Sequence, residues 1–207
     1  MKYTVWKTCK PIPHRDYPVP VEPQGKKASV LIPLVTMEDG QAGILYEVRS
    51  RNIFQGGEIS FPGGGIENGE SAENTAIRET CEELFLDRSQ VHVIMPLNEA
   101  GGPGGRRVIS FLGTLDGYTG THSKDEVESV FVIPVTWFLT HPPKIYHAKA
   151  VPELPADFPY ELIPGGRNYP WRGAKKDYYF YTTPHGVIWG LTAKLTYFFL
   201  QDFGDCL

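Results

Sequence analysis

Apolar residues along the chain fall into short runs and alternations that predict strands, separated by turn-forming segments. ASVLIPLV (28–35) and GILYEVRS (43–50) flank Glu38-Asp39-Gly40, a combination typical of a turn, and predict a β-hairpin. The segment 127–139 alternates well enough for a strand followed by a short helix. Three further strands are predicted at 91–96, 107–115 and 177–183.

The segment GESAENTAIRETCEEL (69–84) predicts an amphipathic helix with an unusually acidic face. On a helical wheel of ~100° per residue, three glutamates share an arc of ~100° and three apolar residues lie opposite. The acidic face consists of Glu79, Glu82 and Glu83, and the apolar face of Ile77, Cys81 and Leu84. Ser71 is expected to cap the first turn, where the helix dipole favours Glu70 and Glu73.

The C-terminal third of the chain combines an irregular segment with a helix. The segment 141–172 is rich in proline and aromatic residues and predicts irregular structure. Its aromatic residues at 158–171 are expected to pack or to form a dimer surface rather than to bind adenine. Apolar residues at helical spacing predict a helix over 187–203, in which Trp189 is expected to lie in the core.

Strands combined with few helices predict one compact α/β or α+β domain over 28–207. The segment 1–27 is rich in proline and charge and is expected to be an N-terminal arm. The formal net charge of −4 provides no general attraction for nucleic acid, and no apolar run approaches the ~20 residues of a membrane helix. The three widely spaced cysteines predict neither a disulfide framework nor a zinc site, and a cytoplasmic location is expected. They are Cys9, Cys81 and Cys206.

The acidic face of the helix admits two interpretations. It can be a solvated surface, which is the usual role of such a face. Against this, Glu79 and Glu83 form a like-charge i,i+4 pair, and Arg78 precedes Glu82 in the weaker orientation for a helical ion pair. Carboxylates with little neutralisation are typical of a site for Mg²⁺, which also bridges to phosphates. The preceding triple glycine, 63–65, would let the backbone approach such a ligand closely.

The spacing of these residues resembles the Nudix box, G-x5-E-x7-R-E-U-x-E-E-x-G-U, where U is a bulky aliphatic residue. Seven of nine specified positions match, namely Gly64, Glu70, Arg78, Glu79, Glu82, Glu83 and Leu86. Thr80 and Phe85 depart from the pattern. Because phenylalanine resists the left-handed conformation that glycine would adopt after the helix, the helix is expected to end differently, about a turn later.

The resemblance implies an α/β/α sandwich with a mixed β-sheet and a loop-helix-loop motif, in an enzyme that hydrolyses nucleoside diphosphates linked to another group. It implies that Glu79, Glu82 and Glu83 bind Mg²⁺ or Mn²⁺. Glu70 and Arg78 would brace the helix, and Gly64 would shape the loop. A carboxylate, either a glutamate of the box or Glu126, would take the proton of the attacking water, and Glu126 is alternatively a further metal ligand.

The segment RSRNIFQGGEISFPGG (49–64) is similar to the motif of the coenzyme A pyrophosphatase branch, in which L-L-T-x-R-S precedes spaced arginine and glycine residues and F-P-G-G. The similarity implies hydrolysis of coenzyme A or its derivatives to 4′-phosphopantetheine and adenosine 3′,5′-bisphosphate. The gap between Ser50 and Gly57 is one residue short of the pattern, so Arg51 is a candidate for the missing arginine. The expected substrate-binding residues are Arg49, Arg51, Gly57, Phe61, Gly63 and Gly64.

Two alternatives stay open. The same chemistry could act on ADP-ribose, a nucleotide sugar or a damaged nucleotide. Alternatively, the chain could be a non-catalytic module that binds a nucleotide metabolite, although such a module has no need for all three glutamates of the helix. In each case the expected partner is a small nucleotide diphosphate, and a homodimer is compatible with the aromatic region.

Overall fold

The computed structural model of the chain describes residues 27–101 and 106–204. The N-terminal arm, except for Lys27, and the cysteines at 9 and 206 lie outside the described residues. The described chain is built on a seven-stranded sheet with the spatial order β3-β2-β1-β6-β5, to which β4 and β7 add by pairing with β1 and β2. Its strands are β1 (Lys27–Thr36), β2 (Ala42–Arg49), β3 (Ile59–Ser60), β4 (Gly63–Gly65), β5 (Val91–Gly101), β6 (Arg107–Leu115) and β7 (Val127–Pro134).

The sheet is mixed, and it divides where β1 and β2 separate. β1 runs parallel to β6, whereas the other pairs are antiparallel. β1 and β2 pair close to their connecting turn, through Leu34–Thr36 and Ala42–Ile44. Beyond that point β1 pairs with the glycines of β4, and β2 pairs with β3 and β7. The division brings the glycine-rich β4 into the same region as the charged end of β2.

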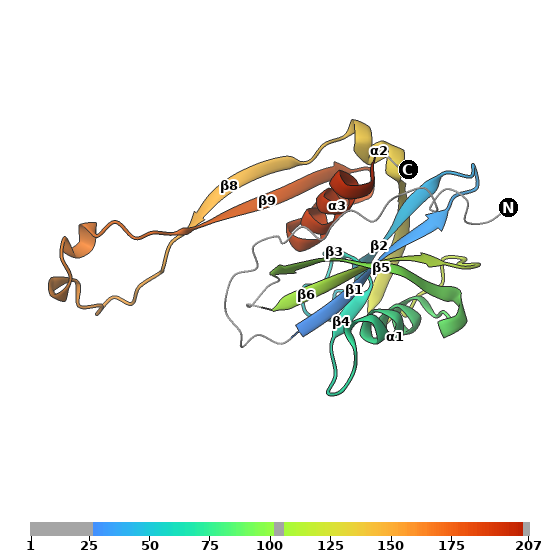
Figure 1. The fold of residues 1–207 in the computed structure, drawn as a ribbon, viewed down its shortest axis with the longest axis horizontal. Helices are drawn as coiled ribbons and strands as arrows, with labels where there is room; N and C mark the ends of the chain where they lie inside the picture. The colour runs from blue at the N-terminus through green and yellow to red at the C-terminus, as the bar shows by residue number, and fades with distance from the viewer. Residues whose placement is uncertain (1–26, 102–105, 205–207) are drawn as a thin grey trace.

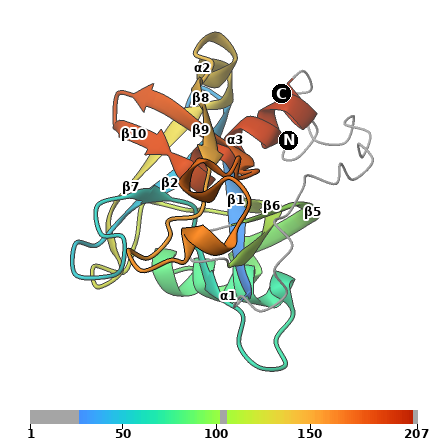
Figure 2. The same ribbon diagram turned by 90° about the vertical axis from the view of Figure 1, so that its left-hand side faces the viewer.

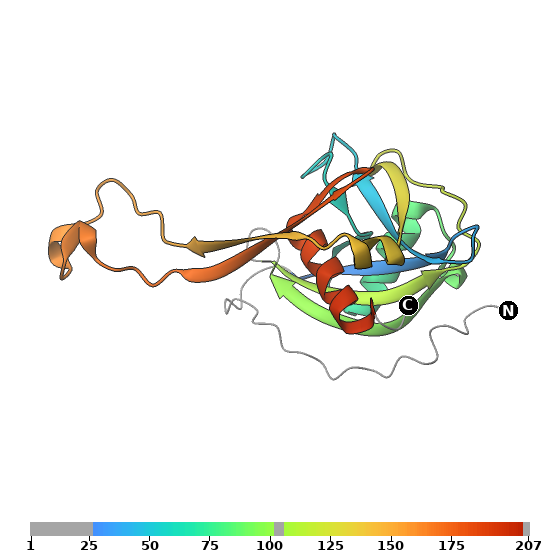
Figure 3. The same cartoon turned by 90° about the horizontal axis from the view of Figure 1, so that it is seen from above.

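Helices cover both faces of this sheet, as Figure 1 shows with α1 below it and α3 above it. α1 (Ala72–Leu84) buries Ala76, Ile77 and Leu84 against Leu31 and Phe111 of the sheet. The opposite face packs against α2 (Val135–Thr140) and α3 (Gly190–Phe203), and Figure 3 shows these two helices from above. This arrangement confirms the expected α/β/α sandwich with a mixed sheet. Among the described residues, no helix combines the length and apolar character needed to span a membrane.

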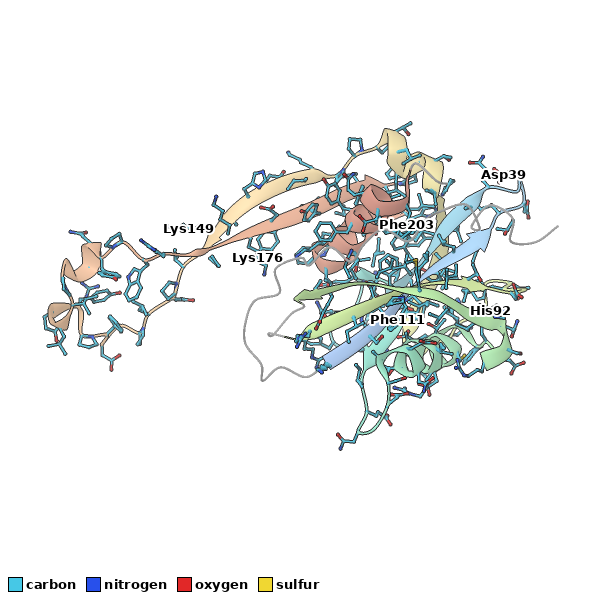
Figure 4. All side chains as sticks on the ribbon, in the orientation of Figure 1. Asp39, His92, Phe111, Lys149, Lys176 and Phe203 are labelled. Atoms are coloured by element: carbon cyan, nitrogen blue, oxygen red, sulfur yellow. The ribbon has the colours of Figure 1, made fainter. Side chains whose placement is uncertain are left out.

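A second, three-stranded sheet extends from the body as a long arm, which Figure 1 shows from the side and Figure 2 shows end-on. It contains β8 (Lys144–Ala150), β9 (Ala174–Thr183) and β10 (Gly186–Trp189). The prediction of irregular structure over 141–172 was wrong for β8. That strand is exposed on most of its length and gains its hydrogen bonds from β9, so its sequence has no apolar face to reveal it. Figure 4 shows Lys149 and Lys176 on this β8–β9 arm, away from Phe111 in the body.

Short 3₁₀ helices complete the described structure. One, η2 (Arg88–Gln90), follows α1, and two lie at the tip of the β8–β9 arm. The two at the tip are η4 (Tyr160–Leu162) and η5 (Gly166–Asn168).

The C-terminal helix begins three residues later than the sequence predicts. Residues 187–189 pair with β9 as part of β10, and α3 begins at Gly190. Strand geometry sends successive side chains to opposite faces, so Ile188 is buried whereas Trp189 is 41% exposed and stacks on Phe180. The expectation that Trp189 lies in the core was therefore wrong.

Helix α1 ends at Leu84 rather than a turn later, because Phe85 does adopt the left-handed conformation (φ 52°, ψ 52°). The tertiary structure holds the end of the helix in place. Ser123 N–H donates to the Glu83 carbonyl at 2.7 Å, and Thr121 Oγ1 donates to the Leu84 carbonyl at 2.7 Å. These contacts occupy the last helical carbonyls and outweigh the local preference of phenylalanine.

Phe85→Gly is expected to raise the free energy of unfolding by about 1 kcal/mol, because a Cβ in the left-handed region costs about 1–2 kcal/mol and glycine returns part of this through its greater freedom when unfolded. Phe85 is 63% exposed, so little packing is lost. Urea unfolding measures the change. Phe85→Ala is the control, since it removes the ring but keeps the Cβ. A gain for alanine equal to that for glycine would contradict this explanation.

Candidate active site

The acidic helix α1 is fixed at its first turn. Ser71 Oγ accepts the Asn74 N–H at 3.2 Å, which confirms the predicted cap. Arg78 donates to both carboxylate oxygens of Glu70, from Nε at 3.0 Å and from Nη2 at 3.1 Å. This pairing, together with a hydrogen bond from Thr75, lowers the pKa of Glu70 to about 2. Arg78 and Glu70 thus join the helix to the loop that precedes it, in the arrangement expected of bracing residues.

Arg78 also contacts the acidic face of the helix. Its Nη1 lies 3.0 Å from Glu79 Oε1 and 3.0 Å from Glu82 Oε2. The sequence suggested that these acids had little neutralisation, and the structure corrects this in part. Arg78 contacts the adjacent Glu79 and also Glu82, one helical turn later. With Glu70, its guanidinium therefore pairs with three carboxylates.

Two glycines bring the backbone of β4 against the helix. The Gly63 N–H donates to Glu83 Oε2 at 2.8 Å. Gly63 has φ 151° and lies so close to Ser29 and Val30 of β1 that a Cβ would overlap their backbone. A Cβ on Gly64 would instead overlap the carboxylate of Glu79. Glycine is therefore required at both positions for the carboxylates to approach the loop.

A second strand adds a carboxylate to this region that sequence reasoning missed. Glu47 on β2 is completely buried, and its Oε1 accepts a hydrogen bond from Ser60 Oγ at 2.8 Å. The pKa of Glu47 is raised to about 7, mainly by burial and to a smaller extent by the nearby Glu126 and Glu79, against the opposing effects of Ser60 and Arg49. The signal in the sequence was a charged residue inside the otherwise apolar strand GILYEV.

Glu83 is the most enclosed acid of the helix. It is 2% exposed, and burial followed by the charge of Glu47 raises the pKa of Glu83 well above its ordinary value. Burial likewise raises the pKa of Glu79, against the effect of Arg78, with smaller contributions from Glu82 and Glu126. Glu47, Glu79, Glu83 and Glu126 therefore form one interacting group, the carboxylate cluster.

Glu126 reaches the carboxylate cluster from the loop before β7. The loop is anchored by the Ser123 N–H bond to α1 and by the Ser50 N–H, which donates to the Glu126 carbonyl at 2.8 Å. Arg49, at the end of β2, lies with Nη1 3.8 Å from Glu47 Oε1 and lowers the pKa of Glu47 and Glu83. The structure thus brings Arg49 and Glu126 to the glutamates of the helix.

Other predicted site residues lie elsewhere. Arg51 is 82% exposed and pairs with Glu128 at 3.2 Å, so the structure gives it a surface ion pair. Phe61 is buried and stacks on Tyr46 with ring centroids 5.0 Å apart, so it supports the loop from the core, and its contact with a substrate stays a prediction. Gly57 has φ 81° and donates its N–H to the Arg49 carbonyl, so it shapes the loop behind Arg49.

The chemistry of the carboxylate cluster suits a hard divalent cation. Mg²⁺ prefers oxygen ligands, and a cation would offset the mutual repulsion that raises the pKa of Glu47 and Glu83. In the positions that the side chains adopt, no three His, Cys, Asp or Glu residues of the described chain are arranged as a ligand set. Glu79 contacts Arg78 and Glu83 contacts Gly63, so an ion would have to replace some of these contacts.

With divalent cations removed by a chelator, the protein is expected to lose stability between about pH 4.5 and pH 7. The folded pKa of Glu47 is about 7 against an ordinary value of 4.5, so the folded state binds more protons than the unfolded state in this range. Stability therefore falls as pH rises, by on the order of 3 kcal/mol for this group. The free energy of unfolding of the wild type minus that of Glu47→Gln, measured in urea across this pH range, isolates the effect. A difference that does not change with pH would contradict the prediction.

Comparisons with known proteins agree with this geometry. The NUDIX domain family matches residues 25–154. The chain is 30% identical over 200 residues to Nudix hydrolase 22, chloroplastic, of Arabidopsis thaliana, covering 91% of this chain and 60% of that protein. It is 31% identical over 185 residues to the mitochondrial coenzyme A diphosphatase NUDT8 of Homo sapiens, covering 84% of this chain and 68% of that protein.

Among solved structures, a MutT/nudix family protein from Enterococcus faecalis superposes with a TM-score of 0.51 at 13% identity, covering 91% of this chain and 66% of the other. At that identity the similarity concerns the fold alone. The chain spans 60% of the length of the Arabidopsis relative, so the activity of that whole protein does not transfer directly. Because the family match extends over more than half of the chain and includes the glycine loop, α1 and Glu126, the chain belongs to the Nudix hydrolase family.

Proposed function

We propose that the protein hydrolyses the diphosphate linkage of a nucleoside diphosphate derivative in the presence of Mg²⁺ or Mn²⁺, and that its substrate class is coenzyme A and its derivatives. The observation that carries this proposal is the position of Glu79 and Glu83, which α1 holds against the glycines at 63 and 64. A solvated acidic face would not explain why Glu83 is 2% exposed and turned toward the loop.

Each part of the site has a task in this reaction. Glu79, Glu82 and Glu83 would hold the divalent cation, which when bound neutralises diphosphate oxygens and lowers the pKa of a coordinated water. The open backbone at Gly64 and the guanidinium of Arg49 would position the anionic diphosphate. Glu126, or a glutamate of the helix, would accept the proton of the attacking water. A new P–O bond then forms to the water oxygen, and the bridging P–O bond breaks so that the second phosphate leaves.

Two observations favour coenzyme A among diphosphate substrates. The segment 49–64 is similar to the coenzyme A pyrophosphatase motif, and the human relative is named a coenzyme A diphosphatase. The first products would be 4′-phosphopantetheine and adenosine 3′,5′-bisphosphate. The alternative substrates are ADP-ribose, nucleotide sugars and damaged nucleotides. The same hydrolysis would apply to them with a different leaving group.

A substrate panel tests the proposal. The protein is incubated with coenzyme A, ADP-ribose and NADH, each with Mg²⁺ or Mn²⁺ in water enriched in ¹⁸O, and the products are identified by mass. Turnover of coenzyme A at the highest kcat/KM, with ¹⁸O in one of the two products, is the expected result. Faster turnover of ADP-ribose would transfer the assignment to that substrate. Tight binding without hydrolysis of any member would reject the enzyme in favour of a binding module.

We further infer a homodimer that forms through the tip of the β8–β9 arm. An isolated two-stranded ribbon is marginally stable in water, and the segment that joins β8 to β9 exposes apolar side chains, including Leu162, which is 77% exposed. A second copy would cover these side chains. Sedimentation equilibrium of the wild type is expected to give about twice the chain mass of 23.2 kDa.

Leu162→Asp is expected to shift that dimer to the monomer, because it places a charge in the contact. Glu153→Gln, an exposed polar substitution in the same segment, is the matched control and should stay dimeric. A monomeric wild type at micromolar concentration would reject the dimer. The absence of nucleic-acid and membrane partners, and the cytoplasmic location, stay predictions from the sequence.

A further inference from the structure

Glu47 is a buried acid whose hydrogen bonding is incomplete. It lies in the middle of the paired part of β2, opposite Ser60 of β3 and Val130 of β7. Its side chain is fully buried, and Oε1 is satisfied by Ser60 Oγ at 2.8 Å. Within the described part of the chain, Oε2 is buried and finds no hydrogen-bond partner.

Such an arrangement destabilises the fold unless a cation or a hydrogen-bond donor binds the unpaired oxygen. A buried polar atom without a partner loses its hydration without compensation, and a buried charge loses far more. A strand between apolar neighbours could carry leucine or valine at this position at no such cost, as β2 does at Leu45 and Val48. The carboxylate is therefore best explained by a ligand that the chain itself does not supply.

The groups that surround Glu47 identify the chemistry of that ligand. Glu79, Glu83 and Glu126 lie close enough to interact with it electrostatically, and each of them is an acceptor when ionised. The Gly63 N–H, which lies nearby, already donates to Glu83. Arg49 supplies positive charge, but from the side of Oε1, at 3.8 Å. A cation on the side of Oε2 would give that oxygen the partner it lacks and would offset the repulsion among the acids.

We propose that Glu47 is a further ligand of the divalent cation, contributing Oε2 from β2 together with the glutamates of α1. The inference rests on the proposed function, because it assumes that this site holds such a cation. The ion would then be held between a strand and a helix that come from separate parts of the chain. Its affinity would depend on the sheet as well as on the residues of the Nudix box.

The test measures binding of Mn²⁺ rather than activity. Titration followed by the electron paramagnetic resonance signal of free Mn²⁺ gives the Kd for the wild type, Glu47→Gln, Glu83→Gln and Glu58→Gln. Glu58→Gln is the matched control, since Glu58 lies in the adjacent loop and its carboxylate accepts from Gln55 instead. Glu47→Gln and Glu83→Gln are each expected to raise the Kd by at least about 10-fold, whereas Glu58→Gln should match the wild type.

The outcomes separate this inference from the proposed function. Wild-type affinity in Glu47→Gln, combined with weakened binding in Glu83→Gln, would overturn the role of Glu47 and leave the proposed function standing. Undetectable Mn²⁺ binding by the wild type, or unchanged affinity in both variants, would overturn both. Glutamine keeps the acceptor for Ser60 and removes a buried charge, so the variant is expected to fold. If it does not, Glu47→Met, of similar length and without charge, replaces it in the same titration.

Discussion

Glu83→Gln is expected to lower kcat by roughly 10²–10³-fold, the loss typical of removing one group that stabilises the transition state. The substitution keeps the shape of the side chain and an oxygen that can accept the Gly63 N–H. It removes the one negative charge of α1 that is both deeply buried and turned toward the glycine loop. Because burial raises the pKa of Glu83, the neutral amide is expected to leave the free energy of unfolding unchanged or slightly higher.

Steady-state kinetics with Mg²⁺ and urea unfolding together measure this effect. Glu73→Gln is the matched control, since Glu73 lies on the same helix, in its exposed first turn. That control should retain full activity and lose at most about 1 kcal/mol through the helix dipole. Unchanged turnover in Glu83→Gln would reject the assignment of the site, whereas loss of activity accompanied by unfolding would show only that the residue is structural.

Gly64→Ala is expected to lower kcat/KM by about 10²-fold, because a displacement of about 1 Å in a catalytic group can cost that much. The added methyl group would occupy the space of the Glu79 carboxylate. Gly64 has no positive φ, so the backbone accepts alanine, and the flexible glutamate side chain moves instead. Stability should therefore change little while the carboxylate is displaced.

Gly65→Ala provides the control one residue further along β4. A Cβ there meets nothing within 4 Å, and the residue also has no positive φ. The same kinetic assay is expected to give wild-type values for this variant. Equal losses in Gly64→Ala and Gly65→Ala would mean that the triple glycine acts through its flexibility, and not through the close approach of Glu79 to Gly64.

The part of the fold that carries the glutamates of α1 could be predicted, because the patterns that specify it lie within short segments of the sequence. The helix over 72–84, its Ser71 cap and the acidic face follow from residues within a few turns of one another. The strands that became β1, β2, β6 and β7 carry apolar residues on faces that the core buries. Phe85 shows the limit of this reasoning. Its own preference predicted a later end for α1, yet hydrogen bonds from residues 121 and 123 end the helix before it.

The sequence by itself determined the set of acids on α1, since that set depends on spacing along one segment. The resemblance of this spacing to the Nudix box implied the family and the sandwich architecture. The tertiary structure alone decided which distant groups join the acids of α1. It paired the exposed strand β8 with β9, and it placed Glu47 of β2 beside Glu83 of α1. Strand pairing and the meeting of side chains across a core depend on partners far along the chain. No local pattern encodes those partners, so a buried glutamate in an apolar strand is recognised as part of a site only when the structure shows what surrounds it.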